Sequence, residues 1–204
     1  MRNTQPKARQ CRREGVNLFG SPKYQKILAR NPNIPGMHGG KRLGKMTEYA
    51  KQLREKQKLK RMFGLSEKQF RRCFDKATIS KVVTGDKLLE ILERRLDNIV
   101  FRAGLAMTRM QSRQFVSHGL LMLNGQRVTI PSIEAKEGDV LEVREKSKKS
   151  KVFAQNKEEL DGTLVPDWLK VDLGKMSIEV LKIPEQKHFE QLIETRSIVE
   201  FYSR

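Results

Sequence analysis

Two arginines stand one helical turn apart in a segment that is predicted to form a short helix. Arg109 and Arg113 are four residues apart, and Gln114 and His118 lie beside them at the same spacing. Thr108, followed by a glutamine three residues later, has the pattern of a capping box and places the helix N-terminus next to Arg109. Guanidinium groups beside the unpaired N–H groups of a helix N-terminus suit phosphate oxygens. The alternative is a solvated basic face, which this helix alone favours, and the rest of the sequence shifts the balance toward phosphate binding.

A second series of cationic residues lies in the segment 47–63, which is predicted to be a long helix. Thr47 has the type of an N-cap residue, and Gly64 follows where the helix should end. Only two glutamates interrupt the series, so the helix is predicted to present a cationic ridge several phosphate spacings long. A solvated charged face is again the alternative, although such faces usually carry both signs of charge. The members of the ridge are Lys51, Arg54, Lys58 and Arg61.

The helix that carries Arg109 belongs to a module of closely spaced start and stop signals between residues 92 and 143. Apolar residues at helical spacing predict a preceding helix over 92–103, followed by Gly104 at its C-cap. After the second helix come two short apolar runs separated by Asn124-Gly125, the pattern of a β-hairpin with a type I′ turn. A further strand is expected at 140–143. The module is therefore predicted to contain two helices and a small antiparallel sheet.

The charge of the chain indicates a polyanionic partner. The 204 residues contain 42 Lys and Arg against 24 Asp and Glu, a net charge of +18. Residues 1–61 hold 17 of the cations and 3 acids, a net charge of +14, whereas residues 151–204 hold 8 cations and 10 acids, a net charge of −2. A compact chain with such a surplus repels itself unless a polyanion neutralises it. The basic surface is therefore expected in the front and middle of the chain.

Residues 1–45 are rich in Arg, Lys, Gly, Pro and Asn, and the closing stretch 29–45 shows almost no periodic apolar pattern. Such a segment buries too little apolar surface to become ordered by itself. One interpretation is a floppy tail. The charge, including Arg12 and Arg13, favours the other interpretation, an extended arm that orders against nucleic acid.

The sequence gives no support for metal, membrane or enzyme chemistry. Cys11 and Cys73 offer no disulfide framework, and the three histidines share no ligand spacing with them. No apolar run approaches the roughly 18 residues of a membrane span, and the motifs of nucleotide-binding loops and hydrolases are absent. Aromatic residues make up 6% of the chain, too few for a base-stacking platform. We expect recognition to depend on the phosphates and the shape of the polyanionic partner.

Three motifs of the module, RLDNIVFRAG, TRMQSRQFVSHG and LMLNGQRV, resemble the signatures of the S-four RNA-binding domain. That domain occurs in several protein families. The likeness extends over nearly the whole chain, however, because five further motifs resemble, in order, the bacterial-type S-four family of small-subunit ribosomal proteins. These motifs are CRREGVNLF, PGMHGGKR, YAKQLREKQKLKRMFGLSEKQFRR, DWLKVDLGKM and IVEFYSR.

The resemblance and the patterns together predict an α+β fold. Its larger part is a mainly helical domain with an extended basic N-terminal arm, and its smaller part is an S-four-type α/β RNA-binding domain of two helices packed on a short antiparallel sheet. The single tryptophan, Trp168, is expected to lie in a core. The expected boundaries are 1–45 for the arm, 46–92 for the helical domain completed by the C-terminal tail 180–204, 93–156 for the S-four RNA-binding domain, and 157–179 for short strands and turns near the domain boundary.

The resemblance implies a structural constituent of the small ribosomal subunit, and not an enzyme. Members of the family bind small-subunit rRNA directly and nucleate assembly of its 5′ domain at a junction of several helices. They lie near the mRNA entrance, beside ribosomal protein S-five and other small-subunit proteins, and have a role in translational accuracy. Some members also bind their own mRNA. The expected location is a ribosome in the cytoplasm, with an organellar ribosome left open, and no membrane partner is expected.

The resemblance also implies which residues contact RNA. Asn124 has a second interpretation, as the residue with positive φ in the hairpin turn. Asp97 is expected to orient Arg95 or Arg102 and not to contact RNA. The candidate RNA-binding residues are Arg12, Arg13, His38, Lys51, Arg54, Lys58, Arg61, Arg95, Arg109, Arg113, Gln114, His118, Asn124 and Arg127.

No cofactor is expected. Some relatives carry an N-terminal zinc site of four cysteines, of which Cys11 matches one, whereas Ala8, Ser21 and Lys26 stand at the other three positions. A single thiolate does not hold structural zinc. The N-terminal segment is then expected to be ordered by RNA and by local packing.

Two other classes of protein use the same domain. An RNA pseudouridine synthase or a tyrosyl-tRNA synthetase needs a separate catalytic domain, and residues 1–92 and 158–204 offer no nucleophile, base or nucleotide loop. A stand-alone RNA chaperone or stalled-ribosome factor is usually shorter and has no N-terminal arm or C-terminal tail.

Overall fold

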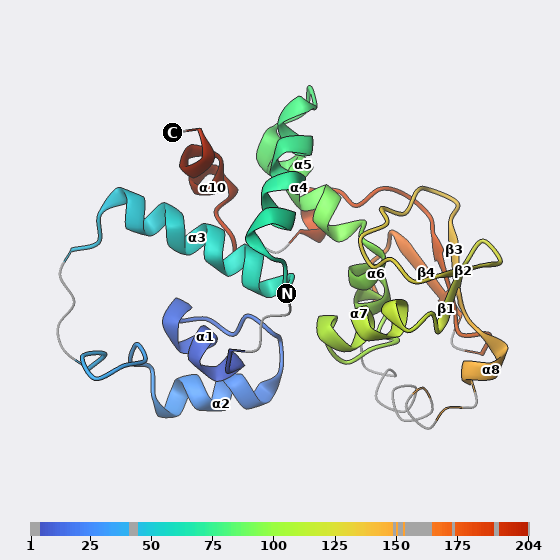
Figure 1. The fold of residues 1–204 in the computed structure, drawn as a ribbon, viewed down its shortest axis with the longest axis horizontal. Helices are drawn as coiled ribbons and strands as arrows, with labels where there is room; N and C mark the ends of the chain where they lie inside the picture. Colours follow the sequence, from blue (N-terminus) through green and yellow to red (C-terminus); the bar gives the residue numbers. More distant parts are fainter. Residues whose placement is uncertain are drawn as a thin grey trace. The chain divides into compact units, whose positions relative to one another are not determined.

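The computed structural model describes residues 5–40, 45–148, 150, 153, 165–172, 174–189 and 192–203. The chain divides into two compact units, Met1–Gly85 with Glu190–Arg204, and Asp86–Phe189. The described part of the first unit is helical, and the second unit combines helices with an antiparallel sheet (Figure 1). This confirms the expected α+β fold class. Within the described ranges, no helix has both the length and the apolar character needed to cross a membrane.

The helices of the first unit begin and end at the capping signals of the sequence. Thr47 Oγ1 accepts a hydrogen bond from the backbone N–H of Ala50 at 3.2 Å, and Ser66 and Gln69 form a complete capping box. Gly64 has a φ of 61°, the left-handed conformation that commonly ends a helix. The helices are α1 (Lys7–Glu14), α2 (Pro22–Arg30), α3 (Glu48–Met62), α4 (Glu67–Ile79) and α10 (Thr195–Tyr202), with α5 (Thr84–Glu93) leading into the second unit.

The N-terminal segment differs from the extended arm expected for 1–45, of which residues 1–4 and 41–44 lie outside the described ranges. The helices α1 and α2 lie in this segment, and α1 packs against both α2 and α3. Cys11 is buried, and Arg12 is bonded within the segment. The helices were missed because the composition of the segment outweighed the short helical pattern of Tyr24, Ile27 and Leu28 in α2. Polar contacts such as those of Arg12 also hold the segment, and they have no periodic signature in the sequence.

The C-terminal helix α10 packs on α3 and closes the first unit with two aromatic residues. Tyr202 lies against Phe74 with ring centroids 4.5 Å apart, and its hydroxyl donates to Glu67 at 2.9 Å. Phe201 lies under the ammonium group of Lys56, 4.5 Å from the ring centre. Lys56 is buried and donates to Glu67 at 2.7 Å. The carboxylate and the aromatic rings replace the water that this lysine gives up.

One five-stranded antiparallel sheet organises the second unit. Its strand order is β2-β1-β3-β5-β4, so β3 joins the predicted hairpin to a second hairpin from later in the chain. Asn124 and Gly125 have φ values of 49° and 79°, as a type I′ turn requires. The strands are β1 (Leu121–Leu123), β2 (Gln126–Val128), β3 (Val140–Val143), β4 (Leu169–Asp172) and β5 (Ser177–Val180).

Strands β4 and β5 extend the sheet beyond the limit at residue 156 that was expected for the RNA-binding domain. Within 157–179, β5 pairs with β3, where Leu141 lies opposite Ile178, and β4 pairs with β5. Residues 157–164 and 173 lie outside the described ranges. The tail expected over 180–204 is likewise divided, because its part up to Phe189 belongs to the second unit. The remaining elements of this unit are α6 (Leu96–Arg102), α7 (Arg109–Ser117), α8 (Glu145–Lys148) and the 3-10 helix η2 (Gln186–His188).

The helix expected over 92–103 is interrupted between α5 and α6. The chain there pairs with a distant loop: the Arg94 carbonyl accepts from the N–H of Ala135 at 2.9 Å, and the N–H of Leu96 donates to the carbonyl of Ile133 at 3.0 Å. These tertiary hydrogen bonds outweigh the local helix propensity. The break matters for the candidate site, because it turns the first residues of α6 toward α7.

The core of the second unit lies between the sheet and the helices α6 and α7. Trp168 is fully buried, which confirms that the single tryptophan lies in a core. Other buried apolar residues of this core come from α6, α7 and the sheet, among them Leu96, Ile99, Phe115, Val116, Leu121, Leu141 and Ile178.

Protonation of Glu67 should weaken the first unit at acid pH. Burial raises the pKa of Glu67, but hydrogen bonds from Lys56, Lys60 and Tyr202 outweigh it and lower the pKa from 4.5 to about 2. A lowered folded-state pKa contributes stability above the unfolded-state pKa, and this contribution is lost as the pH falls through the folded value. Between pH 4.5 and about 2, the thermal midpoint of the wild type in far-UV circular dichroism should fall more than that of Glu67→Gln.

Trp168 provides an internal control, since its fluorescence follows the unfolding of the second unit alone. The tryptophan transitions of the two proteins should coincide at every pH. If the circular-dichroism midpoints of both proteins fell in parallel, Glu67 would not be the source of the acid sensitivity.

Candidate RNA-binding surface

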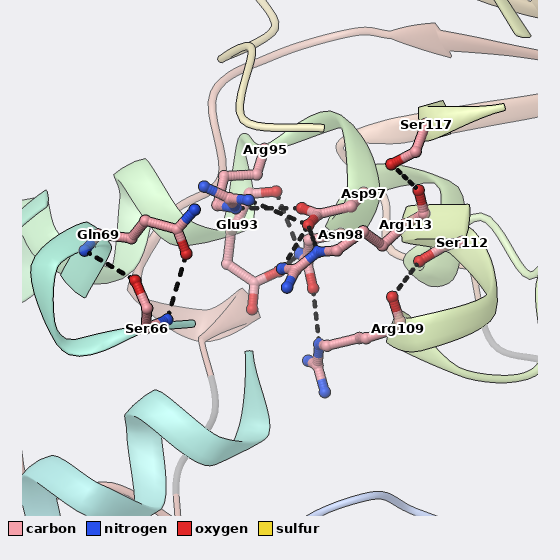
Figure 2. Close-up of polar contacts among 10 residues, drawn as sticks. All are labelled: Ser66, Gln69, Glu93, Arg95, Asp97, Asn98, Arg109, Ser112, Arg113 and Ser117. Carbon is pink, nitrogen blue, oxygen red and sulfur yellow. Dashed lines mark hydrogen bonds and ion pairs between the residues drawn. The ribbon is translucent and has the colours of Figure 1, made fainter. Parts of the chain in front are cut away.

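A buried aspartate holds two arginines where α6 meets α7 (Figure 2). Asp97 lies in the first turn of α6, and its side chain is only 4% exposed. Its two carboxylate oxygens accept hydrogen bonds from Nε and Nη2 of Arg95 at 3.1 and 3.0 Å. One of these oxygens also accepts from Nε of Arg113 at 2.7 Å and lies 2.6 Å from its Nη2. Arg95 is buried with Asp97, whereas the Arg113 side chain is 30% exposed.

A buried glutamate and an asparagine hold two more arginines in the same region. Glu93, at the end of α5, accepts from Nε and Nη2 of Arg102 at 3.0 and 2.7 Å. Asn98 Nδ2 donates to the Glu93 carboxylate at 2.6 Å, and Asn98 Oδ1 accepts from Nε of Arg109 at 2.8 Å (Figure 2). The Arg109 guanidinium also lies 4.5 Å from the centre of the Phe101 ring, a cation–π contact.

The local sequence of α7 places its two arginines at this network. Thr108 Oγ1 accepts from the N–H of Gln111 at 3.2 Å, so the predicted N-cap is confirmed and the helix begins at Arg109. The four-residue spacing then brings Arg109 and Arg113 to one face. Ser112 is fully buried on another face and donates to the Arg109 carbonyl at 2.9 Å. A small polar residue therefore lets α7 pack closely while the arginines stay at the edge of the core.

The acids of this cluster are stable in a buried position only because arginines contact them. Burying an unpaired carboxylate costs several kcal/mol, and removing one partner from a buried pair typically costs about 3–5 kcal/mol. Glu93 and Asp97 carry two negative charges, while Arg95, Arg102, Arg109 and Arg113 carry four positive charges. The cluster therefore keeps a positive surplus at a partly exposed surface, which is the electrostatic condition for binding an anion.

A second basic group lies at the C-terminal end of α7. Arg127 Nη2 donates to the carbonyl of His118 at 3.4 Å, and Arg144 Nη1 donates to the carbonyl of Gly119 at 3.2 Å. Both guanidiniums neutralise carbonyls that the helix leaves unpaired. A Cβ on Gly119 would lie 2.3 Å from Arg127 Nε, so only a glycine leaves room for this arrangement. Gln114 and His118 are exposed.

Asn124 is fully used by the fold. Its positive φ belongs to the hairpin turn. Its Nδ2 donates to Asp139 Oδ1 at 2.9 Å, and its Oδ1 accepts from the N–H of Val140 at 2.9 Å. The structural interpretation of Asn124 is sufficient to explain why an asparagine stands there.

In the first unit, α1 places a carboxylate against the predicted ridge of α3. The Glu14 side chain is fully buried and pairs with Arg54 Nη1 at 3.3 Å and with Arg61. Its second oxygen, Oε2, has no hydrogen-bond partner. Burial raises the pKa of Glu14 against the opposing charges of Arg54 and Arg61, and burial likewise lowers the pKa of Arg54. Arg54 and Arg61, two of the four ridge residues, therefore hold α1 against α3.

The other members of the ridge pair with glutamates of their own helix. Lys51 donates to Glu48 at 2.7 Å in a largely exposed pair, and Lys58 pairs with Glu55. An exposed i,i+3 pair such as Lys51–Glu48 exchanges readily with solvent and contributes little stability, whereas Lys58 and Glu55 are only 18% and 16% exposed. Lys51 is thus the ridge residue that the fold engages least.

The three remaining candidates lie in the N-terminal segment. Arg12 donates from Nε to the carbonyl of Asn33 at 3.0 Å and from Nη2 to Asn31 Oδ1 at 3.2 Å, so it ties the segment together. Arg13 and His38 are exposed. Burial raises the pKa of the Cys11 thiol, which lies in the core of this segment. Among the residues that the structure describes, no three His, Cys, Asp or Glu side chains gather as metal ligands would.

The network shows which roles sequence reasoning found and which it missed. Asp97 orients Arg95, as expected, but Arg102 pairs with Glu93 instead. The parts played by Glu93, Asn98 and Arg144 were not foreseen. No spacing rule identifies them, because they depend on the break between α5 and α6 and on the return of β3 to the end of α7.

Two family models match this chain, one after the other. Residues 2–93 match the family described as "Ribosomal protein S4/S9 N-terminal domain", and residues 94–141 match the "S4 domain". The chain is similar to "Small ribosomal subunit protein uS4" of Borrelia duttonii, with 46% identity over 97% of this chain and 96% of that protein. It is also similar to the protein of the same name from Syntrophomonas wolfei, with 45% identity over 100% of this chain and 99% of that protein.

Replacing both arginines that contact Glu14 should destabilise the first unit. Arg54→Met with Arg61→Met leaves a buried carboxylate without charged partners, which we expect to lower the free energy of unfolding by about 2–4 kcal/mol. Lys51→Met is the matched control, because its partner Glu48 is 71% exposed and surface pairs contribute about 0–1 kcal/mol. Urea unfolding followed by circular dichroism measures both effects.

Adding Glu14→Gln to the double variant should recover part of the lost stability, since the buried charge is then removed. A triple variant no more stable than the double variant would show that the arginines stabilise the unit by other contacts.

Proposed function

The chain belongs to the uS4 family of small ribosomal subunit proteins, and we propose on this basis that it binds small-subunit rRNA directly and nucleates assembly of the 5′ domain. Membership makes it a structural, RNA-binding component of the small subunit and not an enzyme. The similarity supports the proposal over the full length of the chain, beyond the S4 domain that several families share.

The arginine cluster at α6 and α7 is the observation that supports this proposal best. It lies within the residues that match the S4 domain. Arg102 and Arg113 remain 22% and 30% exposed while their guanidiniums are bonded to buried acids. Guanidiniums held in this way lose less conformational freedom when they contact phosphate oxygens, so more of the contact energy appears as affinity.

The basic residues of the first unit support a division of labour. Arg13, His38 and Lys51 are exposed and would contact RNA, whereas Arg54 and Arg61 hold α1 against α3. The N-terminal segment would thus present phosphate contacts from a surface that is already folded. Cys11 would serve as a buried core residue, without zinc.

The finer features of the family complete the proposal. The protein would lie near the mRNA entrance of a cytoplasmic ribosome, beside ribosomal protein S-five, and would influence translational accuracy. Binding to its own mRNA would use the same arginine surface, because phosphate contacts do not distinguish one RNA from another.

The proposal predicts selective and salt-dependent binding to small-subunit rRNA. A transcript of the 5′ domain should bind more tightly than an unrelated structured RNA of equal length. The log–log slope of affinity against salt should be steep, since each phosphate contact contributes about 0.7–0.9. Filter binding or fluorescence anisotropy over a series of potassium chloride concentrations measures both quantities. Equal affinity for the two RNAs would leave only a generic basic protein.

Removing the arginines of α7 should weaken RNA binding more than it weakens the fold. Arg109→Ala with Arg113→Ala should lower the affinity and reduce the salt slope by about 0.7–0.9 for each phosphate that is no longer neutralised. The thermal midpoint should fall, because Asp97 and Asn98 each lose an arginine partner, but the protein should stay folded at the temperature of the titration because Asp97 keeps both bonds to Arg95. Arg196→Ala removes an arginine that is 86% exposed on α10 and serves as the control for the loss of a positive charge. A double variant that binds as the control does would contradict this role.

A further inference from the structure

We propose that Asp97 and Asn98 are positioning residues for RNA binding, which act through the guanidiniums of Arg113 and Arg109 and do not contact RNA themselves. The inference rests on the proposed function for the identity of the ligand. It assigns a role in recognition to two side chains that are almost completely buried, 3% and 1% exposed, beneath arginines at the surface.

Asp97 restricts the position of the Arg113 guanidinium. Both Nε and Nη2 of Arg113 lie within 2.7 Å of the same carboxylate oxygen. Two N–H groups that share one acceptor keep this edge of the guanidinium against Asp97 and leave it less freedom to move than a single hydrogen bond would. The carboxylate cannot follow Arg113 toward solvent, because its two oxygens are also bonded to the buried Arg95.

Arg95 connects this arrangement to the backbone of the unit. It precedes α6, and its backbone forms an isolated antiparallel bridge with Glu134. The backbone therefore restricts the movement of Arg95, Arg95 restricts that of Asp97, and Asp97 restricts that of the Arg113 guanidinium. A phosphate would meet a guanidinium whose position is already set.

Asn98 positions the Arg109 guanidinium in the same way, but it carries no charge. Its Oδ1 accepts from Nε of Arg109, and its Nδ2 donates to the carboxylate of Glu93, so its amide has one orientation. The Phe101 ring supports the other side of the guanidinium. A substitution of Asn98 therefore tests positioning at constant net charge.

The sign of the effect separates positioning from electrostatics at Asp97. A carboxylate beneath a phosphate-binding surface repels the phosphate, and this repulsion is poorly screened at a buried site. If Asp97 acted only through its field, Asp97→Asn would strengthen RNA binding. If it positions Arg113, the same substitution weakens binding even though the protein becomes more positive.

A double-mutant cycle tests the proposal. The wild type, Asp97→Asn, Arg113→Ala and the double variant are titrated with the 5′-domain transcript and with an unrelated structured RNA. We expect Asp97→Asn alone to weaken binding about 3- to 10-fold, the factor that corresponds to the net contribution of one typical hydrogen bond. In the Arg113→Ala background the same substitution should not weaken binding further, because the group through which Asp97 acts is gone.

Glu142→Gln provides the matched control for charge. Glu142 is an exposed acid on β3, so its substitution raises the net charge by the same amount without touching the arginine network. It should leave RNA binding unchanged or slightly tighter. Thermal unfolding of every variant shows which of them are folded at the temperature of the titration.

Asp97→Asn leaves Arg95 with a weaker partner and is the variant most exposed to loss of folding. If Asp97→Asn does not fold, the double-mutant cycle of Asn98→Ala with Arg109→Ala tests the proposal instead. We expect Asn98→Ala to lower the RNA affinity in the wild-type background and to leave it unchanged in the Arg109→Ala background. Tighter or unchanged binding by the folded single variants overturns the proposal, and so does an equal loss in both backgrounds. Equal affinity of the wild type for both RNAs would contradict the 5′-domain assignment. The double-mutant cycle would still test the positioning role of Asp97 and Asn98, because it can be measured with either RNA.

Discussion

A carboxylate that leaves water must be neutralised by cations in direct contact, and both units of this protein depend on that requirement. Glu14 of α1 pairs with arginines of α3, Glu93 of α5 with an arginine of α6, and Asp97 of α6 with an arginine of α7. In each case the acid and the arginine come from different helices. The buried ion pairs therefore join α1 to α3, α5 to α6 and α6 to α7, in addition to apolar contacts such as those between α6 and α7.

This requirement explains how so basic a chain can fold and still bind a polyanion. A net charge of +18 opposes compaction. The buried acids relieve the repulsion locally, at the points where arginines crowd together, and leave a surplus of positive charge at the surface. Each arginine of the cluster at α6 and α7 can thus contact two partners: a polar group beneath it in the protein, and a phosphate of the RNA outside it. Fold and recognition share the same side chains.

Sequence reasoning succeeded where the determinants are local. The type I′ turn at Asn124-Gly125 and the N-cap at Thr108 follow from the residues themselves, and Arg109 and Arg113 were correctly placed on one helix. It failed where the local structure depends on contacts with segments that are distant in the sequence. The break after α5 depends on hydrogen bonds to residues near Ile133, and α1 depends on an ion pair with α3. The joining of β4 and β5 to the sheet is set by β3, and no periodic pattern carries that information.

In the candidate site, the residue types were predictable but their roles were not. Arginines near a helix N-terminus indicate phosphate binding from the sequence alone. Which of them is buried, as Arg95 is, and which acids hold the others, depends on how α5, α6 and α7 meet.

The closure of the first unit by α10 has a consequence for the order in which the chain folds during synthesis. Tyr202 and its partner Glu67 are 135 residues apart, and the whole second unit lies between them in the sequence. The described strands of the second unit are all made once β5 has left the ribosome, whereas α10 follows only after them. Contacts over such separations form late, because the intervening chain must be made and brought together first. The contacts of α10 with α3 and Glu67 are therefore among the last that the first unit can form, after the sheet of the second unit is already available.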